Sequence, residues 1–132
     1  MKDNIITIDG PSASGKGSLA RNIAAYLDFD ILDSGLLYRV YAYLYDRGLE
    51  HSKIVSHINK DIFFKTDLNG LIIQDGKKDI TGDLRSEKTA KAASKISSLK
   101  ETRSNLLELQ RDFYSSKGLV ADGRDMGTVV FP

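Results

Sequence analysis

The feature that most constrains the fold is a glycine-rich segment between a short apolar run and an amphipathic stretch. The segment reads GPSASGKGS over residues 10–18 and follows the β-branched run IITI at residues 5–8. Its glycines allow the backbone to curl so that successive N–H groups point inward and form a nest for phosphate oxygens. A helix starting near Gly15 would aim its N-terminal dipole at the same point, and Lys16 would add a mobile positive charge. The segment therefore predicts a phosphate-binding loop between a buried strand and a helix.

The residue after the lysine departs from the usual P-loop pattern, in which a serine or threonine follows the lysine directly. Here Gly17 follows Lys16, and the hydroxyl group comes one position later, at Ser18. A hydroxyl at this place can coordinate Mg²⁺ beside the phosphates of a nucleoside triphosphate. The order Gly-Lys-Gly-Ser resembles the loop of nucleoside monophosphate kinases, and this indicates a nucleotide as the phosphoryl acceptor.

Hydrophobic periodicity predicts alternating strands and helices along most of the chain. Buried strands are predicted at residues 5–8, 31–32 and 119–121, and Ser86 is a plausible N-cap of one helix. The inner faces of the other helices are predicted to carry Leu19, Ile23 and Leu27, with Ala20 and Ala24 beside them; Leu37, Val40, Tyr41 and Leu44; Ile54, Val55 and Ile58; and Leu106, Leu109 and Phe113. This alternation is typical of an α/β fold with a parallel sheet and flanking helices.

Residues 61–82 break the alternation. Apolar and polar residues alternate around Phe64, and Asn69-Gly70 is a two-residue hairpin signal because both residues accept positive φ. A second turn is predicted at Asp75-Gly76. We therefore expect a small antiparallel three-stranded insert over residues 61–82, with residues 1–60 and 83–132 forming the core.

Composition argues against several other classes of function. The net charge of the 132 residues is +1, which gives no electrostatic reason for binding a nucleic-acid polymer or an anionic membrane. The chain has no cysteine, which excludes disulfides and fits a cytoplasmic location. No apolar run reaches the roughly 20 residues that a membrane helix needs. The first strand follows Met1 so closely that we expect no signal peptide.

The segment after the second predicted strand offers groups suited to a phosphate. Ser34 can cap the following helix, and Tyr38 lies one turn later on the same face. Arg39 beside it has a forked set of donors that suits a phosphate group. Taken alone, these residues are equally well explained as a core tyrosine and a solvated arginine.

The segment after the third predicted strand carries a second charged group. Asp122 stands where P-loop enzymes keep the carboxylate that supports Mg²⁺. Arg124 and Asp125 follow in a loop beyond the carboxyl end of the strand, where open α/β sheets bind their ligands. Without the other segments, this run predicts only a turn.

Together these segments make the chain similar to the bacterial cytidylate kinase family over essentially its whole length. The matching stretches are residues 8–12, 15–18, 32–35 with 38–39, 92–94 with 103 and 110–111, and 121–132. The last run is the most specific to the family, and the hairpin insert matches the family's extra β-element. The resemblance implies transfer of the γ-phosphoryl group of ATP to CMP or dCMP with Mg²⁺, by an α/β fold of the P-loop nucleoside monophosphate kinase type.

The resemblance also implies roles for individual residues. ATP would be held by Gly10, Pro11, Ser12, Ala13, Ser14, Gly15, Lys16, Gly17 and Ser18. CMP would be bound by Ser34, Tyr38, Arg39, Ser94, Arg103, Arg124 and Asp125. Ser18 and Asp122 would support Mg²⁺, partly through water. Lys16, Arg124 and Asp125 would act in the chemical step.

The resemblance also implies that family members continue beyond the point that corresponds to Pro132, with two more sheet strands and an arginine-bearing lid. We therefore expect the 132-residue chain by itself to be a weak or inactive kinase. In the family the further strands lie beside the first strand, so residues 5–8 would form an open edge here. We expect such a chain to self-associate, although the full-length family member is expected to be a monomer. Two alternatives stay open: a nucleotide-binding fragment without catalysis, and another small-molecule P-loop kinase, such as one acting on shikimate.

Overall fold

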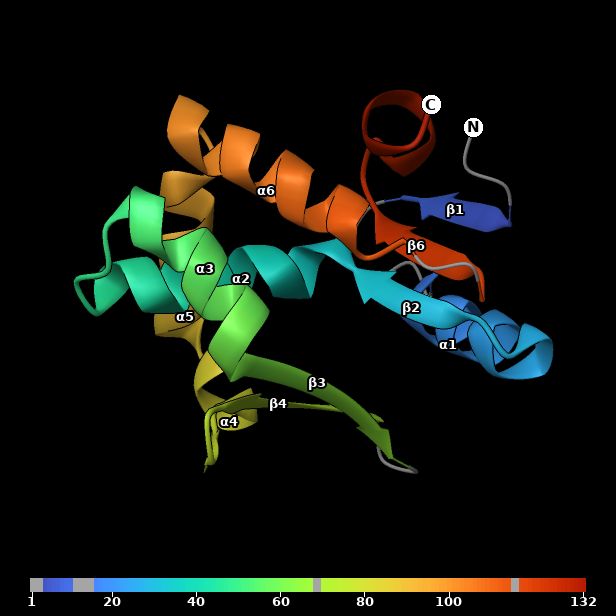
Figure 1. Ribbon diagram of the computed structural model, residues 1–132, viewed down its shortest axis with the longest axis horizontal. Coiled ribbons are helices and arrows are strands. Elements are labelled where there is room, and N and C mark those ends of the chain that lie inside the picture. Colours follow the sequence, from blue (N-terminus) through green and yellow to red (C-terminus); the bar gives the residue numbers. More distant parts are fainter. Residues whose placement is uncertain (1–3, 11–15, 68–69, 115–116) are drawn as a thin grey trace. The chain divides into compact units, whose positions relative to one another are not determined.

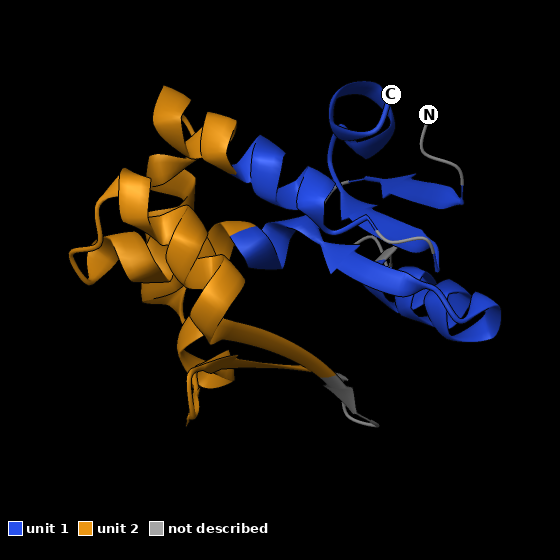
Figure 2. Ribbon diagram, viewed as in Figure 1, with its two compact units in different colours: residues 1–37, 106–132 blue, residues 38–105 orange. Residues whose placement is uncertain are grey.

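The structure is a computed structural model that describes residues 4–10, 16–67, 70–114 and 117–132. The chain divides into two compact units, one of residues 1–37 with 106–132 and one of residues 38–105 (Figure 2). The sequence predicts a different division, into a core and an insert at residues 61–82. That division is defined by segments of the chain and not by compact units, and it stays a prediction.

A three-stranded parallel sheet lies at the centre of the first unit (Figure 1). Strand β6 (Leu119–Gly123) is in the middle, with β1 (Ile5–Asp9) on one side and β2 (Asp30–Asp33) on the other. All five residues of β6 are buried. The register pairs Asp122 with Ile8 and with Asp33, so the carboxyl ends of the three strands meet at one edge of the sheet. The three predicted strands and their parallel arrangement are confirmed.

Helix α1 (Lys16–Leu27) packs on this sheet through small residues. Ala20 and Ala24 are buried against Val120. Partly buried apolar side chains surround this cluster: Ile6, Ile8, Ile23, Phe29 and Ile31. Leu19 and Leu27, which the sequence assigns to the inner face, are 52% and 40% exposed. The prediction was wrong for these two leucines and is confirmed for Ile23, Ala20 and Ala24, which pack on the sheet. The small alanine side chains let the helix approach the strand closely, and the longer leucines are turned outward.

Helix α2 (Ser34–Asp46) begins directly after β2. Its predicted inner face is confirmed, since Leu37, Val40, Tyr41 and Leu44 are all buried. The helix ends before Gly48, whose φ of +99° lies in the region that favours glycine.

The second unit contains the predicted antiparallel insert, with β3 (Ile62–Asp67), β4 (Gly70–Asp75) and the short β5 (Lys78–Asp79) in that order. Helix α3 (His51–Asp61) precedes it, and the single turn α4 (Thr81–Leu84) follows it. The register pairs Asp67 with Gly70, so Gly70 belongs to β4 and not to the turn as predicted. Leu68 and Asn69 lie outside the described residues. The second predicted turn is confirmed at Gly76, where φ is +60°.

The remaining helices follow the predictions closely. Helix α5 (Glu87–Ile96) is capped by Ser86, whose hydroxyl accepts a hydrogen bond from the N–H of Thr89. Helix α6 (Lys100–Asp112) buries Leu106 and Leu109, while Phe113 lies just past its end. None of the helices in the described part of the chain is long and apolar enough to cross a membrane.

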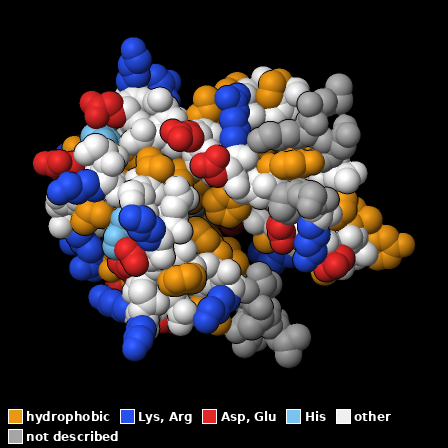
Figure 3. All heavy atoms as spheres, in the orientation of Figure 1, with side chains coloured by type: hydrophobic (Ala, Val, Ile, Leu, Met, Phe, Trp, Pro, Cys, Tyr) orange, Lys and Arg blue, Asp and Glu red, His pale blue; other side chains and the backbone are white. Residues whose placement is uncertain are grey.

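One element has no counterpart in the sequence-based predictions. After β6 the chain forms a short π-helical segment, η1 (Met126–Val130), where only a loop was expected. It buries Met126 and Val130 in the first unit. Acidic and basic side chains are interspersed on the face shown in Figure 3, in keeping with the nearly neutral net charge.

Candidate functional site

The structure places the predicted phosphate loop between β1 and α1. Gly10 follows β1 and donates a backbone hydrogen bond to the carbonyl oxygen of Gly123 in β6 (3.2 Å). Helix α1 begins at Lys16. The loop residues Pro11, Ser12, Ala13, Ser14 and Gly15 lie outside the described residues, as does the side chain of Lys16. The strand before the loop and the helix after it are therefore confirmed.

Asp122 meets the first turn of α1 at the end of the central strand. Its side chain is buried, with 3% of the residue exposed. A Cβ atom on Gly17 would lie 3.7 Å from Oδ2 of Asp122, which shows how closely the helix start approaches the carboxylate. On the next residue, the Ser18 hydroxyl accepts a hydrogen bond from Nη2 of Arg21 (3.3 Å).

These two oxygen groups suit the predicted metal. Mg²⁺ prefers oxygen ligands, and in nucleotide sites it is usually held by one or two carboxylates together with phosphates and water. Asp122 supplies a carboxylate beside the helix that starts after the phosphate loop. Asp122 and Ser18 therefore fit Mg²⁺ bound beside nucleotide phosphates.

Ser34 occupies a different place from the one predicted for a helix cap. It is the first residue of α2, and the capping carboxylate is that of Asp33, whose Oδ1 accepts from the N–H of Leu36 (3.0 Å). The expectation that Ser34 caps α2 was wrong, because the helix begins one residue earlier than the cap assignment required. Ser34 instead donates a buried hydrogen bond to Oε1 of Gln110 (2.6 Å).

Gln110 is in turn fixed by its own helix. Its Nε2 donates to the carbonyl oxygen of Leu106 (3.0 Å), which sets the direction of the side-chain amide. The motifs around Gln110 predicted no role for this residue. No local pattern could have shown that role, because Ser34 and Gln110 are 76 positions apart in the chain.

The loop after β6 carries two more of the predicted residues. Arg124 and Asp125 are both exposed and stand between the end of β6 and the start of η1. Both belong to the first unit, as do Ser34 and Asp122. The sheet edge thus gathers in this unit Gly10 at the start of the phosphate loop, the Asp122 carboxylate and the loop of Arg124.

The other predicted acceptor residues lie in the second unit. Tyr38 and Arg39 are half-buried on α2, and Nη1 of Arg39 donates to the carbonyl oxygen of Leu84 (3.1 Å). Ser94 on α5 and Arg103 on α6 are exposed. For each of these four residues the role in binding CMP stays a prediction.

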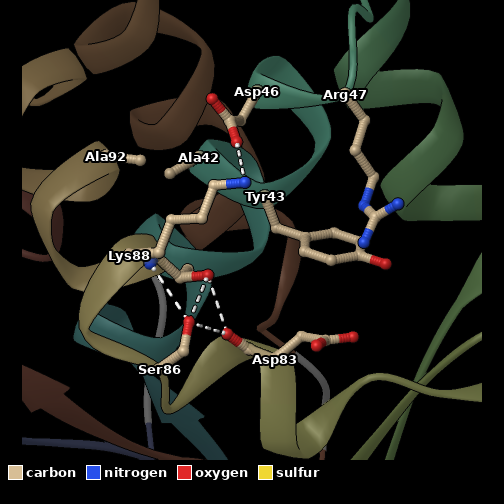
Figure 4. A pocket seen from close by; sticks show the side chains of 9 residues that line it. Ala42, Tyr43, Asp46, Arg47, Asp83, Ser86, Lys88 and Ala92 are labelled. Atoms are coloured by element: carbon tan, nitrogen blue, oxygen red, sulfur yellow. Dashed lines mark hydrogen bonds and ion pairs between the residues drawn. The ribbon is translucent and has the colours of Figure 1, made fainter.

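A cavity of about 230 Å³ in the second unit contains none of the predicted site residues (Figure 4). The guanidinium of Arg47 lies 4.1 Å from the centre of the Tyr43 ring, and Nζ of Lys88 lies 3.7 Å from Oδ2 of Asp46. Two acidic and two basic side chains line it: Asp46, Asp83, Arg47 and Lys88. This balance of charge gives no preference for an anionic ligand such as a nucleotide.

An α/β fold of the P-loop nucleoside monophosphate kinase type accounts for this arrangement of parallel sheet, loop and small antiparallel insert. The family model for cytidylate kinase matches residues 6–132. Proteins named cytidylate kinase from Mannheimia succiniciproducens, Acinetobacter baumannii and Aliivibrio salmonicida are 43%, 42% and 45% identical to this chain. The alignments cover 99%, 100% and 96% of the chain.

The chain therefore belongs to the cytidylate kinase family, as its sequence motifs predicted. The same alignments cover 60%, 61% and 59% of the three relatives. The chain thus spans about three-fifths of the length of the curated relatives it matches.

Proposed function

We propose that this chain binds ATP and CMP or dCMP and serves the transfer of the γ-phosphoryl group of ATP to the acceptor, giving ADP and CDP or dCDP. The observation that carries the proposal is the meeting of three features at one edge of the parallel sheet. These are the start of the phosphate loop at Gly10, the buried carboxylate of Asp122 and the loop of Arg124. Membership of the cytidylate kinase family supports CMP as the acceptor.

The reaction depends mainly on alignment of the two nucleotides and on neutralisation of phosphate charge, and less on covalent participation of protein side chains. An oxygen of the acceptor phosphate bonds to the γ-phosphorus while the bond to the β,γ-bridging oxygen breaks, and ADP keeps that electron pair. Backbone N–H groups of the phosphate loop and the Lys16 ammonium would hold the donor phosphates. Arg39 and Arg124 would grip the acceptor phosphate and neutralise the charge that spreads over the transferred group.

The other residues of the proposed site have supporting roles. Ser34, Tyr38, Ser94, Arg103 and Asp125 would contact the base, the sugar or the phosphate of CMP. Asp122 and Ser18 would hold Mg²⁺. When bound, Mg²⁺ would neutralise part of the charge of the donor phosphates.

Ligand binding measured by thermal unfolding tests the proposal without requiring turnover. A panel of ATP, CMP, dCMP, UMP, AMP and shikimate is compared on the chain. We expect stabilisation by ATP and by CMP or dCMP that grows with concentration and reaches about 2.7 kcal/mol at a hundredfold excess over Kd. Stabilisation by shikimate alone would contradict the proposal. CMP-dependent formation of ADP, followed in a coupled assay, then measures the transfer itself. We expect little or none from the 132-residue chain alone, and normal activity would contradict that expectation.

Lys16→Ala tests the donor side. We expect this variant to keep the fold but to lose stabilisation by ATP, because the lysine charge faces the outer phosphates in P-loop proteins. In an intact enzyme of the family the same substitution should abolish phosphoryl transfer. Lys117→Ala is the matched control, since Lys117 also lies in the first unit but pairs with Asp28 on the surface (3.3 Å). If Lys16→Ala responded to ATP as Lys117→Ala does, the assignment of the phosphate loop would be wrong.

A further inference from the structure

The carboxylate of Asp9 holds two consecutive backbone N–H groups from a distant part of the chain. Asp9 is the last residue of β1. Its Oδ1 accepts a hydrogen bond from the N–H of Met126 (2.7 Å), and its Oδ2 accepts from the N–H of Gly127 (3.1 Å). Both oxygens are therefore engaged by the first two residues of η1. The partners are 117 and 118 positions away, so no sequence pattern indicates this contact.

These two N–H groups need an acceptor from outside their own segment. The first N–H groups of any helical segment have no partner within it, and a nearby carboxylate is favourable there. Residues that precede such a segment often supply the acceptor, but Asp125 makes no capping hydrogen bond with its side chain to η1 in the described structure. Met126 is also almost fully buried, with 1% exposed, so water has little access to it. Asp9 fills the place that a local cap would take.

The backbone around Arg124 and Asp125 is restrained on both sides by β1. Before them, Gly123 pairs with Asp9 in the sheet and accepts from the N–H of Gly10. After them, a Cβ atom on Gly127 would stand 2.9 Å from Oγ1 of Thr7, so this part of the loop lies directly against the strand. Asp125 itself has a φ of +59°, which is uncommon for a residue other than glycine. Such a conformation persists only where its surroundings fix it.

We propose that Asp9 is a positioning residue that fixes Arg124 and Asp125 relative to the start of the phosphate loop. The inference rests on the proposed function, in which these two residues bind the acceptor nucleotide. Asp9 is followed directly by Gly10. Its side chain therefore holds the loop of Arg124 and Asp125, while its backbone continues into the phosphate loop. Transfer between two bound phosphates depends steeply on such alignment. Asp9 acts through Arg124 and Asp125 and does not itself contact nucleotide, because both of its oxygens are already engaged.

The test is Asp9→Asn, which keeps the size of the side chain but turns one of its two acceptors into a donor. We expect the Kd for CMP to rise on the order of tenfold, as for the loss of one charge-assisted hydrogen bond. The Kd for ATP, measured separately by calorimetry, should change by less than about twofold, because the phosphate loop keeps its own N–H groups. Hydrogen exchange at the amides of Met126 and Gly127 should become faster.

A double variant separates positioning from a merely structural role. Because Asp9 acts through Arg124 and Asp125, Asp9→Asn combined with Arg124→Ala should weaken CMP binding by clearly less than the sum of the two separate effects in free energy. Asp79→Asn is the matched control, because Asp79 is also exposed and its Oδ1 also accepts from a backbone N–H, that of Thr81 (2.9 Å). This control should bind both nucleotides as the wild type does.

The outcomes distinguish this inference from the proposed function. If the wild type binds CMP and Asp9→Asn binds it equally well, or if the two substitutions add, the inference is overturned while the proposed function stands. If the wild type binds neither nucleotide, the proposed function fails and the inference fails with it. Should Asp9→Asn not fold, Gly127→Ala takes its place, because its methyl group would push the same loop away from Thr7. Unchanged CMP affinity in that variant would also overturn the inference.

Discussion

At the scale of single residues, the hydrogen bond between Ser34 and Gln110 has a measurable consequence for stability. Both residues are buried, with 5% and 3% exposed, and the bond is short at 2.6 Å. Ser34→Ala removes the donor and leaves Oε1 of Gln110 without it in a buried place. We expect the free energy of unfolding, measured with urea, to fall by about 1–3 kcal/mol.

The matched control for this change is Ser104→Ala, which alters an exposed serine of α6. It should change stability by less than about 0.5 kcal/mol. Equal effects of the two substitutions would mean that the buried bond contributes nothing beyond an ordinary surface serine.

The pair of Ser34 and Gln110 also shows how much of this residue's role could be predicted from the sequence. The resemblance identified Ser34 as a candidate for binding CMP, but its partner depends on the packing of α2 and α6, and the sequence predicted a capping role that Asp33 takes.

At the scale of elements, α1 separates what periodicity can predict from what it cannot. The helix itself was predicted, and Ala20, Ala24 and Ile23 pack on the sheet, but Leu19 and Leu27 were also assigned to the inner face and are exposed. Ala20→Leu should lower the free energy of unfolding by about 1–3 kcal/mol, because Ala20 is fully buried against β6 and a larger side chain overpacks that contact. Leu19→Ala should cost less than about 1 kcal/mol, since Leu19 is half exposed. A helix that buried Leu19 would show a larger loss for Leu19→Ala, so urea unfolding of the two variants decides which residues face the sheet.

Most of the other elements could be predicted because their signals are local. The turn at Gly76 and the cap at Ser86 depend on neighbouring residues only, and both are confirmed. The segment η1 was missed because the acceptors for its first N–H groups come from Asp9, at the other end of the chain. Helical structure that depends on a distant carboxylate leaves no periodic trace in the sequence.

At the scale of the whole molecule, the two compact units were not predicted, and a physical reason is visible in their boundaries. These boundaries fall between residues 37 and 38 and between residues 105 and 106, inside α2 and α6. Sequence analysis finds boundaries in polar or glycine-rich linkers, and a continuous helix offers no such signal. The predicted acceptor residues consequently divide between units, with Ser34, Arg124 and Asp125 in the first and the other four in the second.

The strand order of the parallel sheet leads to a prediction about association. Among the described residues, β1 pairs with β6 along one side only, so its other side is an open edge. An unpaired edge is a template for another strand. The apolar side chains of Ile5, Val130 and Phe131 line a cavity of about 460 Å³ beside this strand, which adds apolar surface at the edge. We therefore expect the 132-residue chain to self-associate through β1, with a sedimentation coefficient that rises with concentration.

Ile5→Lys tests whether β1 is the contact. A lysine at the edge introduces a charge that two associating copies would bring together, so we expect the concentration dependence to be strongly reduced. Val129→Lys is the control, because Val129 is 53% exposed on η1 and its replacement removes apolar surface without changing the strand. It should sediment as the wild type does. A wild type that sediments as a monomer at every concentration would contradict the prediction, and an equal effect of both substitutions would assign the association to general apolar surface, not to the edge of β1.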